Sequence, residues 1–387
     1  MDYSQRLREH TPALDGIRGL AVLSVFVHHF GGGSSSVYLP IRLIGNIVRS
    51  GWLGVSLFFV LSGFLISGIL WDSFGQPHWW RNFYARRALR IFPLYYLTIL
   101  LILILSMVAT RSVEFPEGVG VLALYLQNFP PLFPALRAIP AAVRTSHLWS
   151  LGVEEQFYLF WPFILMAVGR ISAAKSACIV VFVASILFRI VAYRWFPSGQ
   201  EWAYTCLLGR MGELSAGAYL ALAIRGEERA TILKYAAPTA TVTFIILALT
   251  LSLSGSRTAD SLLVLVFGMS VAAILFASLI AIVLRPGPLQ RLFEVRPLRW
   301  VGKISYGIYV YHVLLGPAYT VITSQIIHSA GNAFQICRFF VAAILTLVIS
   351  AISFYGFERP IQRFKSRFPM KQSTVERATS PISVAQQ

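Results

Sequence analysis

Apolar residues fall into ten long runs separated by short polar connections. A helix needs about 20 apolar residues to cross the roughly 30 Å hydrocarbon layer of a membrane, and each run approaches that length. The predicted spans cover residues 14–31, 51–71, 91–110, 147–168, 174–194, 206–224, 232–253, 261–284, 303–326 and 334–357. The pattern predicts an all-α, polytopic integral membrane protein with about ten transmembrane helices in one domain, residues 1–370. The polar tail, residues 371–387, is expected to be disordered and cytoplasmic.

Composition agrees with this class, because 56% of the 387 residues are hydrophobic and only 13% are charged. Lys and Arg nevertheless outnumber Asp and Glu by 33 to 16, for a formal net charge of +17. In the predicted topology 22 of these cations lie in the two termini and alternate loops, eight lie in the opposite loops, and three lie within spans. The positive-inside rule therefore places both termini in the cytoplasm, and we expect the protein to lie in the plasma (inner) membrane. It also explains the net charge without a nucleic-acid partner.

Two features limit the remaining possibilities. Residues 111–146 contain five prolines around the short apolar stretch VLALYLQNF, which is too short to span and predicts a re-entrant or lid-like segment. The three cysteines, Cys178, Cys206 and Cys337, have no partner at disulfide or metal spacing, so we expect no structural disulfide and no metal.

The first span carries charged and titratable residues in the stretch LDGIRGLAVLSVFVHHF. Arg18 and His29 are 11 residues apart, which places them about 20° from perfect alignment on one helix face and about 16 Å apart along the axis. His28 points to another face, and Asp15 can pair with Arg18 one turn away. This stripe favours a functional site over interfacial capping, although isolated histidines at a membrane interface are tolerated.

An arginine cluster precedes the third span, in the stretch WWRNFYARRALRIFPLYY. Arg87 and Arg90 lie one turn apart, with Arg86 beside them. Guanidinium groups at this place suit the phosphates of a cytoplasmic, nucleotide-containing donor. The alternative is that they only anchor the helix end by the positive-inside rule.

The fourth span opens with SHLWSLGVEEQFYLFWP, so His147 is followed by Glu154 and Glu155 within the apolar run. Adjacent carboxylates cannot share one helix face, so we expect at least one of them to point into a cavity, with Tyr158 one turn beyond Glu154. Acidic residues inside a membrane span are functional candidates, although hydrogen bonds from neighbouring helix ends could give one of them a structural role.

Two other spans carry polar residues. In the ninth, Ser305, Tyr309 and His312 recur at helical spacing and form one polar ribbon, which suggests a lined cavity. In the sixth, Arg210 and Glu213 are one turn apart and predict a structural ion pair.

Several separated motifs together resemble the membrane acyltransferase 3 family. They are LDGIRGLA, GWLGVSLFFVLSGFLI, RRALRIFPLYY, HLWSLGVEEQFYLFWP, KISYGIYVYH and the closing FERP, and they follow the family's order over nearly the whole chain. Ser56 departs from the pattern, because many members have an acid there. The resemblance implies transfer of an acyl group, most commonly acetyl, from cytoplasmic acyl-CoA to a hydroxyl of a saccharide or lipid-linked glycan acceptor in the envelope. Membrane lipids are the other expected partner.

The resemblance also implies roles for the candidate residues. It makes His29 and Arg18 the essential pair and matches Glu154 and Glu155 to the family's acidic motif, so these four are the expected catalytic residues. Arg87 and Arg90, with Arg86, are expected to bind the acyl-CoA donor. The expected substrate-binding residues are His147, Tyr158, Tyr309 and His312.

Two mechanisms and two rival functions remain open. Neutral imidazole of His29 can remove the acceptor's proton for direct attack, or it can carry the acyl group itself, while Arg18 stabilises the oxyanion. A proton-coupled transporter or exporter would also need buried Arg, Glu and His, and a receptor could keep the fold without chemistry.

Overall fold

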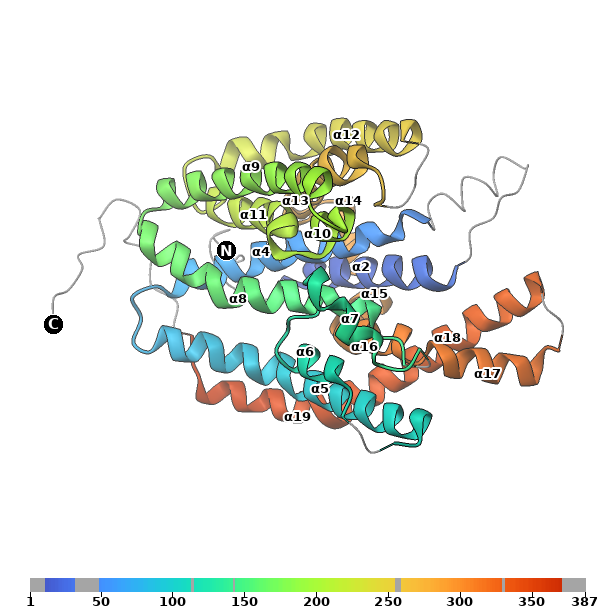
Figure 1. Cartoon of the computed structure of the whole chain (residues 1–387). Coiled ribbons are helices and arrows are strands. Elements are labelled where there is room, and N and C mark those ends of the chain that lie inside the picture. Colours follow the sequence, from blue (N-terminus) through green and yellow to red (C-terminus); the bar gives the residue numbers. More distant parts are fainter. Residues whose placement is uncertain are drawn as a thin grey trace.

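The computed structural model describes residues 11–31, 49–112, 115–141, 143–254, 259–328 and 331–370, and these form a bundle of helices without strands (Figure 1). The predicted tail, residues 371–387, lies outside the described residues. The longer helices are α2 (Pro12–Phe30), α4 (Leu53–Ser73), α5 (Trp79–Thr110), α8 (Trp149–Val168), α9 (Ile171–Trp195), α11 (Leu207–Ala223), α12 (Arg229–Leu253), α13 (Met269–Val283), α16 (Ser305–Leu314), α17 (Gly316–Ile326) and α18 (Asn332–Ser353).

Short helical elements fill the connections between these helices. They are α6 (Glu117–Ala123), α7 (Phe133–Arg137), α10 (Gly199–Thr205), α14 (Pro288–Phe293), α15 (Arg296–Lys303) and α19 (Arg359–Gln362), with single turns η1 (Ser50–Trp52), η2 (Pro130–Leu132), η3 (Ser146–Leu148), η4 (Val264–Gly268), η5 (Phe354–Glu358) and η6 (Arg363–Arg367). The connection that was predicted to be lid-like forms α6 and α7, and the Tyr95 hydroxyl of α5 donates to the Leu122 carbonyl of α6 at 2.6 Å.

Eight helices of the described residues are long and apolar enough to cross a membrane, against ten predicted spans. The predicted span 206–224 forms α11, whose 17 residues are too few to meet that length. The predicted span 303–326 is divided into α16 and α17 at Leu315, because Pro317 at the start of α17 cannot continue the hydrogen-bond ladder of α16. The all-α polytopic architecture is confirmed, and the single ninth helix is replaced by two shorter ones.

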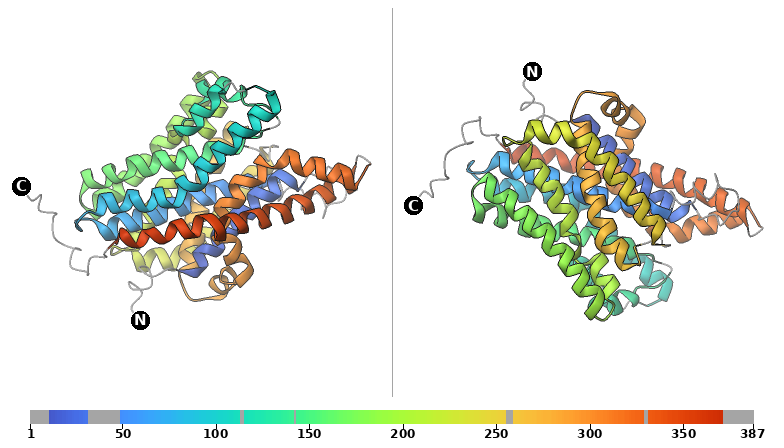
Figure 2. Two further views of the ribbon diagram at one scale, coloured as in Figure 1. Left: turned by 90° about the horizontal axis from the view of Figure 1, so that it is seen from below. Right: turned by 90° about the horizontal axis from the view of Figure 1, so that it is seen from above.

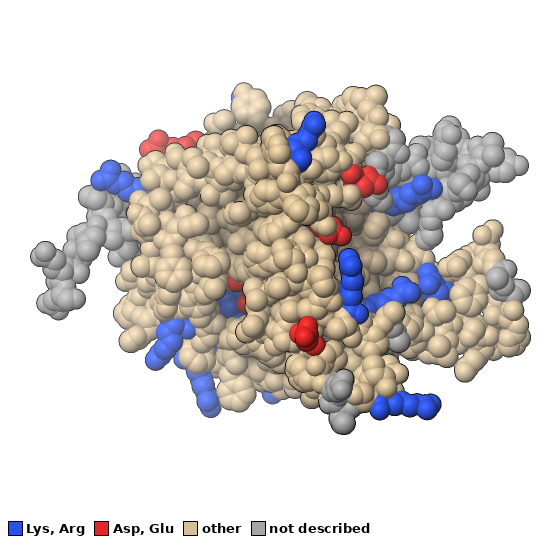
Figure 3. Space-filling model, in the orientation of Figure 1, with Lys and Arg blue, Asp and Glu red and all other residues tan. Residues whose placement is uncertain are grey.

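The outer helices carry their apolar side chains on the surface. Large apolar side chains of α9 and α12, including Val180, Leu187, Phe244 and Leu249, are more than half exposed. The face in Figure 3 is mostly uncharged, with Lys, Arg, Asp and Glu confined to scattered positions. A surface of this kind is stable only against lipid, so the chain is an integral, multi-pass membrane protein.

Helix α11 lies inside the bundle against α4, α9 and α13, which shelter its charged residues from lipid. Arg210 and Glu213 are at most 1% exposed and form the predicted ion pair at 3.1 Å. Ser56 of α4 completes the cluster, because its hydroxyl donates to Glu213 at 3.1 Å and accepts from Arg210 at 3.0 Å. The residue that departs from the family's acidic pattern is therefore part of a structural network.

Glycines allow α4 and α11 to pack closely. A Cβ atom at Gly63 would lie 1.9 Å from the Leu214 carbonyl oxygen, and one at Gly217 would lie 1.9 Å from that of Val60. Small residues at such contacts let helix backbones approach, which is the main source of helix association in lipid. A similar contact joins α2 to α15, where a Cβ at Gly302 would lie 1.8 Å from the Asp15 carbonyl oxygen.

Removing the carboxylate of Glu213 should strongly destabilise the bundle. In Glu213→Ala the guanidinium of Arg210 stays buried without its counter-ion, a change that typically costs about 3–5 kcal/mol. The expected result is a clearly lower melting temperature of the protein purified in detergent. The matched control is Lys175→Gln, which removes the cation of the partly exposed Lys175–Glu228 pair and should leave the melting temperature nearly unchanged. Equal melting temperatures for the two variants would contradict a structural role for the buried pair.

Candidate functional site

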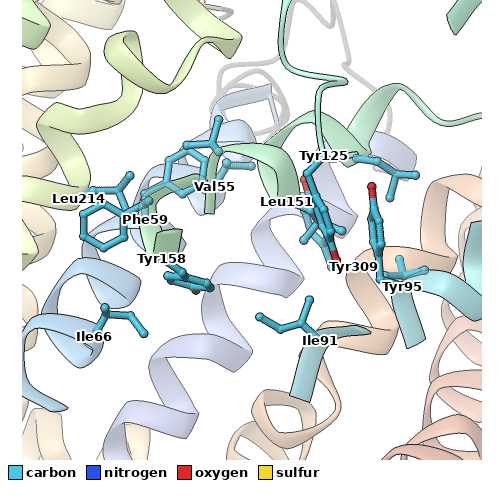
Figure 4. Packing of buried hydrophobic residues seen from close by; sticks show 14 of the residues in the cluster. Val55, Phe59, Ile66, Ile91, Tyr95, Tyr125, Leu151, Tyr158, Leu214 and Tyr309 are labelled. Atoms are coloured by element: carbon cyan, nitrogen blue, oxygen red, sulfur yellow. The ribbon is translucent and has the colours of Figure 1, made fainter. Parts of the chain in front are cut away.

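A narrow cavity of about 100 Å³ opens between α2, α4, α5, α8 and α16. Seven of the eleven residues predicted for the site line this cavity: Arg18, Arg87, Arg90, Glu154, Glu155, Tyr158 and Tyr309. Figure 4 shows the apolar part of its wall, where Ile66, Ile91 and Tyr158 surround the space and Tyr309 stands beside Leu151. The cavity thus brings together residues from four of the motifs, although they are far apart in the sequence.

The three arginines of the cavity differ in their partners. Arg18 donates to Asp15 at 2.8 Å, which confirms the predicted pair on α2. Arg87 lies 5.8 Å from the ring centres of Phe83 and Tyr158. Neither Arg87 nor Arg90 has a hydrogen bond or an ion pair within the described part of the chain. Glu154 and Glu155 line the same cavity but form no ion pair with either guanidinium group in the described part of the chain, so both groups keep donors available for an anion.

Both carboxylates of the fourth span line this cavity, although adjacent residues on a helix were expected to diverge. Glu154 accepts a hydrogen bond from Ser62 of α4 at 2.7 Å, and Ser62 also lies 3.2 Å from the Tyr158 hydroxyl. One oxygen of Glu155 is buried and has no hydrogen-bond partner. The cavity extends around α8 far enough to include both side chains, so Glu154 and Glu155 both remain candidates for a catalytic role.

Tyr309 connects the cavity to a group of histidines. Its hydroxyl lies 2.5 Å from the Ser150 hydroxyl and donates to the backbone carbonyl of His147 at 2.7 Å. The ring of Tyr309 lies 5.6 Å, between centres, from those of His147 and His312. The polar ribbon predicted on 303–326 therefore spans both places: Ser305 and Tyr309 line the cavity, and His312 lies beyond it.

Three histidines from separate elements meet at the far side of Tyr309. Nε2 of His312 lies 3.4 Å from Nδ1 of His29, and the rings of His312 and His147 are 5.2 Å apart between centres. His312 is fully buried, His147 is 4% exposed, and His29 is exposed at the end of α2. The group of His29, His147 and His312 is hereafter called the histidine cluster.

Backbone contacts fix the proton positions in this cluster. Nδ1 of His312 lies 2.7 Å from the Tyr309 carbonyl oxygen, and Nδ1 of His29 lies 2.9 Å from that of Val25. A carbonyl oxygen only accepts, so both Nδ1 atoms carry the proton in the neutral rings. Nε2 of His312 then accepts from His29, and Nε2 of His29 keeps its lone pair. His29 is thus oriented as a base or nucleophile through one defined nitrogen.

Two further residues that the sequence singled out, His28 and Arg86, lie outside the cavity. His28 lies on another face of α2 than His29, where its Cβ packs beside Gly51, as the helical spacing predicts. Arg86 does not line the cavity. Its guanidinium donates instead to the backbone carbonyls of Lys365 at 3.0 Å and Phe368 at 3.2 Å.

Sequence reasoning missed Ser62 and Ser150, which hold Glu154 and Tyr309 in place. Both are single hydroxyl residues in apolar runs, and serines there commonly bond only to their own helix. Their partners lie on other helices, 92 and 159 residues away in the chain. The sequence alone predicts neither contact, because each depends on how α4, α8 and α16 pack against one another.

Comparison with known proteins identifies the family. A sequence model described as "Acyltransferase domain" matches residues 11–355. The chain is 29% identical to "Putative peptidoglycan O-acetyltransferase YrhL" of Bacillus subtilis, over 95% of this chain and 57% of that protein. It is 27% identical to "Peptidoglycan O-acetyltransferase OatA" of Listeria monocytogenes, over 92% of this chain and 56% of that protein. No solved structure matches the chain.

The chain spans a little over half the length of these curated relatives. The family match extends from just before α2 through α18 into η5, and it therefore includes the residues of the cavity and of the histidine cluster. This integral membrane protein therefore belongs to the family of acyltransferase domains.

Proposed function

We propose that this protein transfers an acetyl group from cytoplasmic acetyl-CoA to a hydroxyl of an envelope saccharide, with His29 as the reacting base or nucleophile. The observation that carries the proposal is the arrangement of the cavity. Unpaired Arg87 and Arg90 line it, and Tyr309 joins it to the histidine cluster. The printed names of the relatives support acetyl as the group and a peptidoglycan-like saccharide as the acceptor.

The arginines give the donor its orientation. Phosphate groups held by Arg87 and Arg90 leave the flexible arm of the donor to extend into the cavity, toward Tyr309. Arg18 lies on the same wall, about 16 Å before His29 along α2. A narrow cavity suits such an arm better than a sugar ring, and it excludes water from a thioester before the acceptor is present.

The reaction exchanges a thioester for an oxygen ester. Nε2 of His29 takes the proton of the acceptor hydroxyl, the hydroxyl oxygen forms a bond to the acetyl carbonyl carbon, and the bond from that carbon to sulfur breaks. The thiolate of coenzyme A then takes up the proton. In the stepwise alternative Nε2 first forms the bond to the carbonyl carbon while the carbon–sulfur bond breaks and the thiolate leaves. The acceptor oxygen then bonds to the same carbon, the carbon–nitrogen bond breaks, and the acceptor's proton passes to the thiolate.

The acceptor should approach His29 from the side opposite the cavity. His29 is exposed and does not line the cavity, and it lies at the end of α2 that is predicted to face the outside of the membrane. In this arrangement the two substrates enter from different sides and meet at one imidazole. Family membership favours this transfer over the rival transporter function.

Replacing His29 tests the reacting group. His29→Ala should abolish acetyl transfer from labelled acetyl-CoA while the purified protein keeps its amount and melting temperature, because this side chain is exposed. His28→Gln is the matched control, since it changes the neighbouring imidazole on another helix face and should retain transfer. Normal activity in His29→Ala would rule out its assignment as base or nucleophile.

Replacing the unpaired arginines tests the donor site. Arg87→Gln and Arg90→Gln should each raise the KM for acetyl-CoA roughly tenfold or more, the value of one charge-assisted hydrogen bond. Arg111→Gln is the control, because Arg111 is exposed at the other end of α5. An unchanged KM in both cavity variants would mean that these arginines only anchor the helix.

Replacing His312 tests the orientation of His29. His312→Leu removes the second acceptor, 3.4 Å away, for the Nδ1 proton of His29 that the Val25 carbonyl also accepts, and should lower kcat roughly 10- to 100-fold with little change in the KM for acetyl-CoA. His312→Gln places an amide oxygen near the position of Nε2 and should recover much of kcat. Equal kcat values for the Leu and Gln variants, at equal melting temperatures, would show that the contact with His29 has no part in the reaction.

A further inference from the structure

The C-terminal segment Arg363–Phe368 is fastened to α5 beside the basic part of the cavity. Arg86 donates to the carbonyls of Lys365 and Phe368, and the buried Asn82 donates to that of Pro369 at 2.8 Å. The red helical segment that includes α19 and continues into η6 lies along α5 in Figure 1 and again in Figure 2. These bonds join residues about 280 positions apart and fix the backbone around Lys365 relative to the arginines of α5.

Lys365 adds a cation to this region. Its neighbours Arg363 and Arg367 are exposed, whereas Lys365 is half-buried. Arg86, Arg87, Arg90 and Arg18 supply the positive charge near its ammonium group, and Glu358 is a nearby acid. Its ammonium group donates to the side-chain oxygen of Gln362 at 2.9 Å, and it has no ion pair with a carboxylate in the described part of the chain.

The nearby acids do not neutralise this cluster by direct pairing. Glu358 is 4% exposed and accepts from the Ser353 hydroxyl at 3.2 Å, and Glu154 accepts from Ser62. Within the described residues neither of these acids, nor Glu155 in the same cavity, makes an ion pair with Arg87, Arg90 or Lys365. Like charges held close together repel one another, and this repulsion is relieved when an anion binds between them.

We propose that Lys365 is a further donor-binding residue, which faces the phosphates of the donor together with Arg87 and Arg90, and that Arg86 positions it. The proposal rests on the function proposed above, in which acetyl-CoA is the donor. Coenzyme A carries a diphosphate and a separate 3′-phosphate, and two arginines cannot neutralise all of this charge. An ammonium group supplies a compact charge without the fixed geometry of a guanidinium fork.

The place of the phosphates can be tested by shortening the donor. Lys365→Gln should raise the KM for acetyl-CoA roughly tenfold and leave kcat unchanged, as expected for one lost charge-assisted contact. With acetyl-pantetheine, which lacks the nucleotide and its phosphates, the variant and the wild-type protein should have the same KM. Arg363→Gln is the matched control, because it removes an exposed cation from the same turn and should change neither value.

The positioning role of Arg86 is tested with a double variant. Arg86→Gln should raise the KM for acetyl-CoA in the same way, because it releases the carbonyl of Lys365. The double variant Arg86→Gln/Lys365→Gln should be no worse than Lys365→Gln alone, since the positioned cation is already absent. Lys365→Arg keeps the charge and should stay close to wild type. Melting temperatures of all variants show that the fold is retained.

The outcomes separate this inference from the proposed function. An unchanged KM in Lys365→Gln, together with a raised KM in Arg87→Gln, overturns the role of Lys365 and leaves the donor site intact. An equal penalty with acetyl-CoA and acetyl-pantetheine also overturns it, because the loss then has nothing to do with phosphates. A wild-type protein that transfers nothing from acetyl-CoA overturns the proposed function itself, and this inference with it.

Discussion

The hydrocarbon layer offers no water to a charged side chain, and this constraint shapes the interior of the bundle. Arg210 pairs with Glu213 and Ser56, and Arg189 donates to the Leu265 carbonyl at 2.7 Å and the Ser270 hydroxyl at 2.9 Å. The Leu265 carbonyl belongs to the π-helical turn η4, where the ladder is locally widened. These paired charges hold α4, α9, α11 and α13 together. By contrast, Arg87 and Arg90, which have no ion pair in the described part of the chain, line one cavity.

That contrast separates structural from functional groups more clearly than burial does. A fully paired guanidinium has no remaining interaction to offer a ligand, whereas Arg87 and Arg90 keep their donors available. Maintaining such groups costs stability, so the surrounding structure must hold them in place. The close contacts of α4 with α11, and of α2 with α15, provide this rigidity without using the side chains of the cavity.

Sequence could predict what lies within one helix. The Asp15–Arg18 pair, the Arg210–Glu213 pair and the separation of His29 from His28 all follow from helical spacing, and the structure confirms each of them. The contacts between helices could not be predicted in this way. His312 and His29 are 283 residues apart, and periodicity gives the face of each helix but not the neighbour that this face meets.

The helix break at Leu315 illustrates the same limit and has a consequence for the site. Residues 303–326 are apolar enough to predict one span, yet Pro317 divides them, and α16 ends only two residues after His312. Within its ten residues α16 carries Ser305 and Tyr309 on the cavity and His312 against His29. One short helix therefore touches both the proposed donor path and the imidazole of His29, which is the proposed reacting group. A shift of α16 along its axis would move Tyr309 and His312 together, so the length of the donor path and the orientation of His29 depend on the same rigid element.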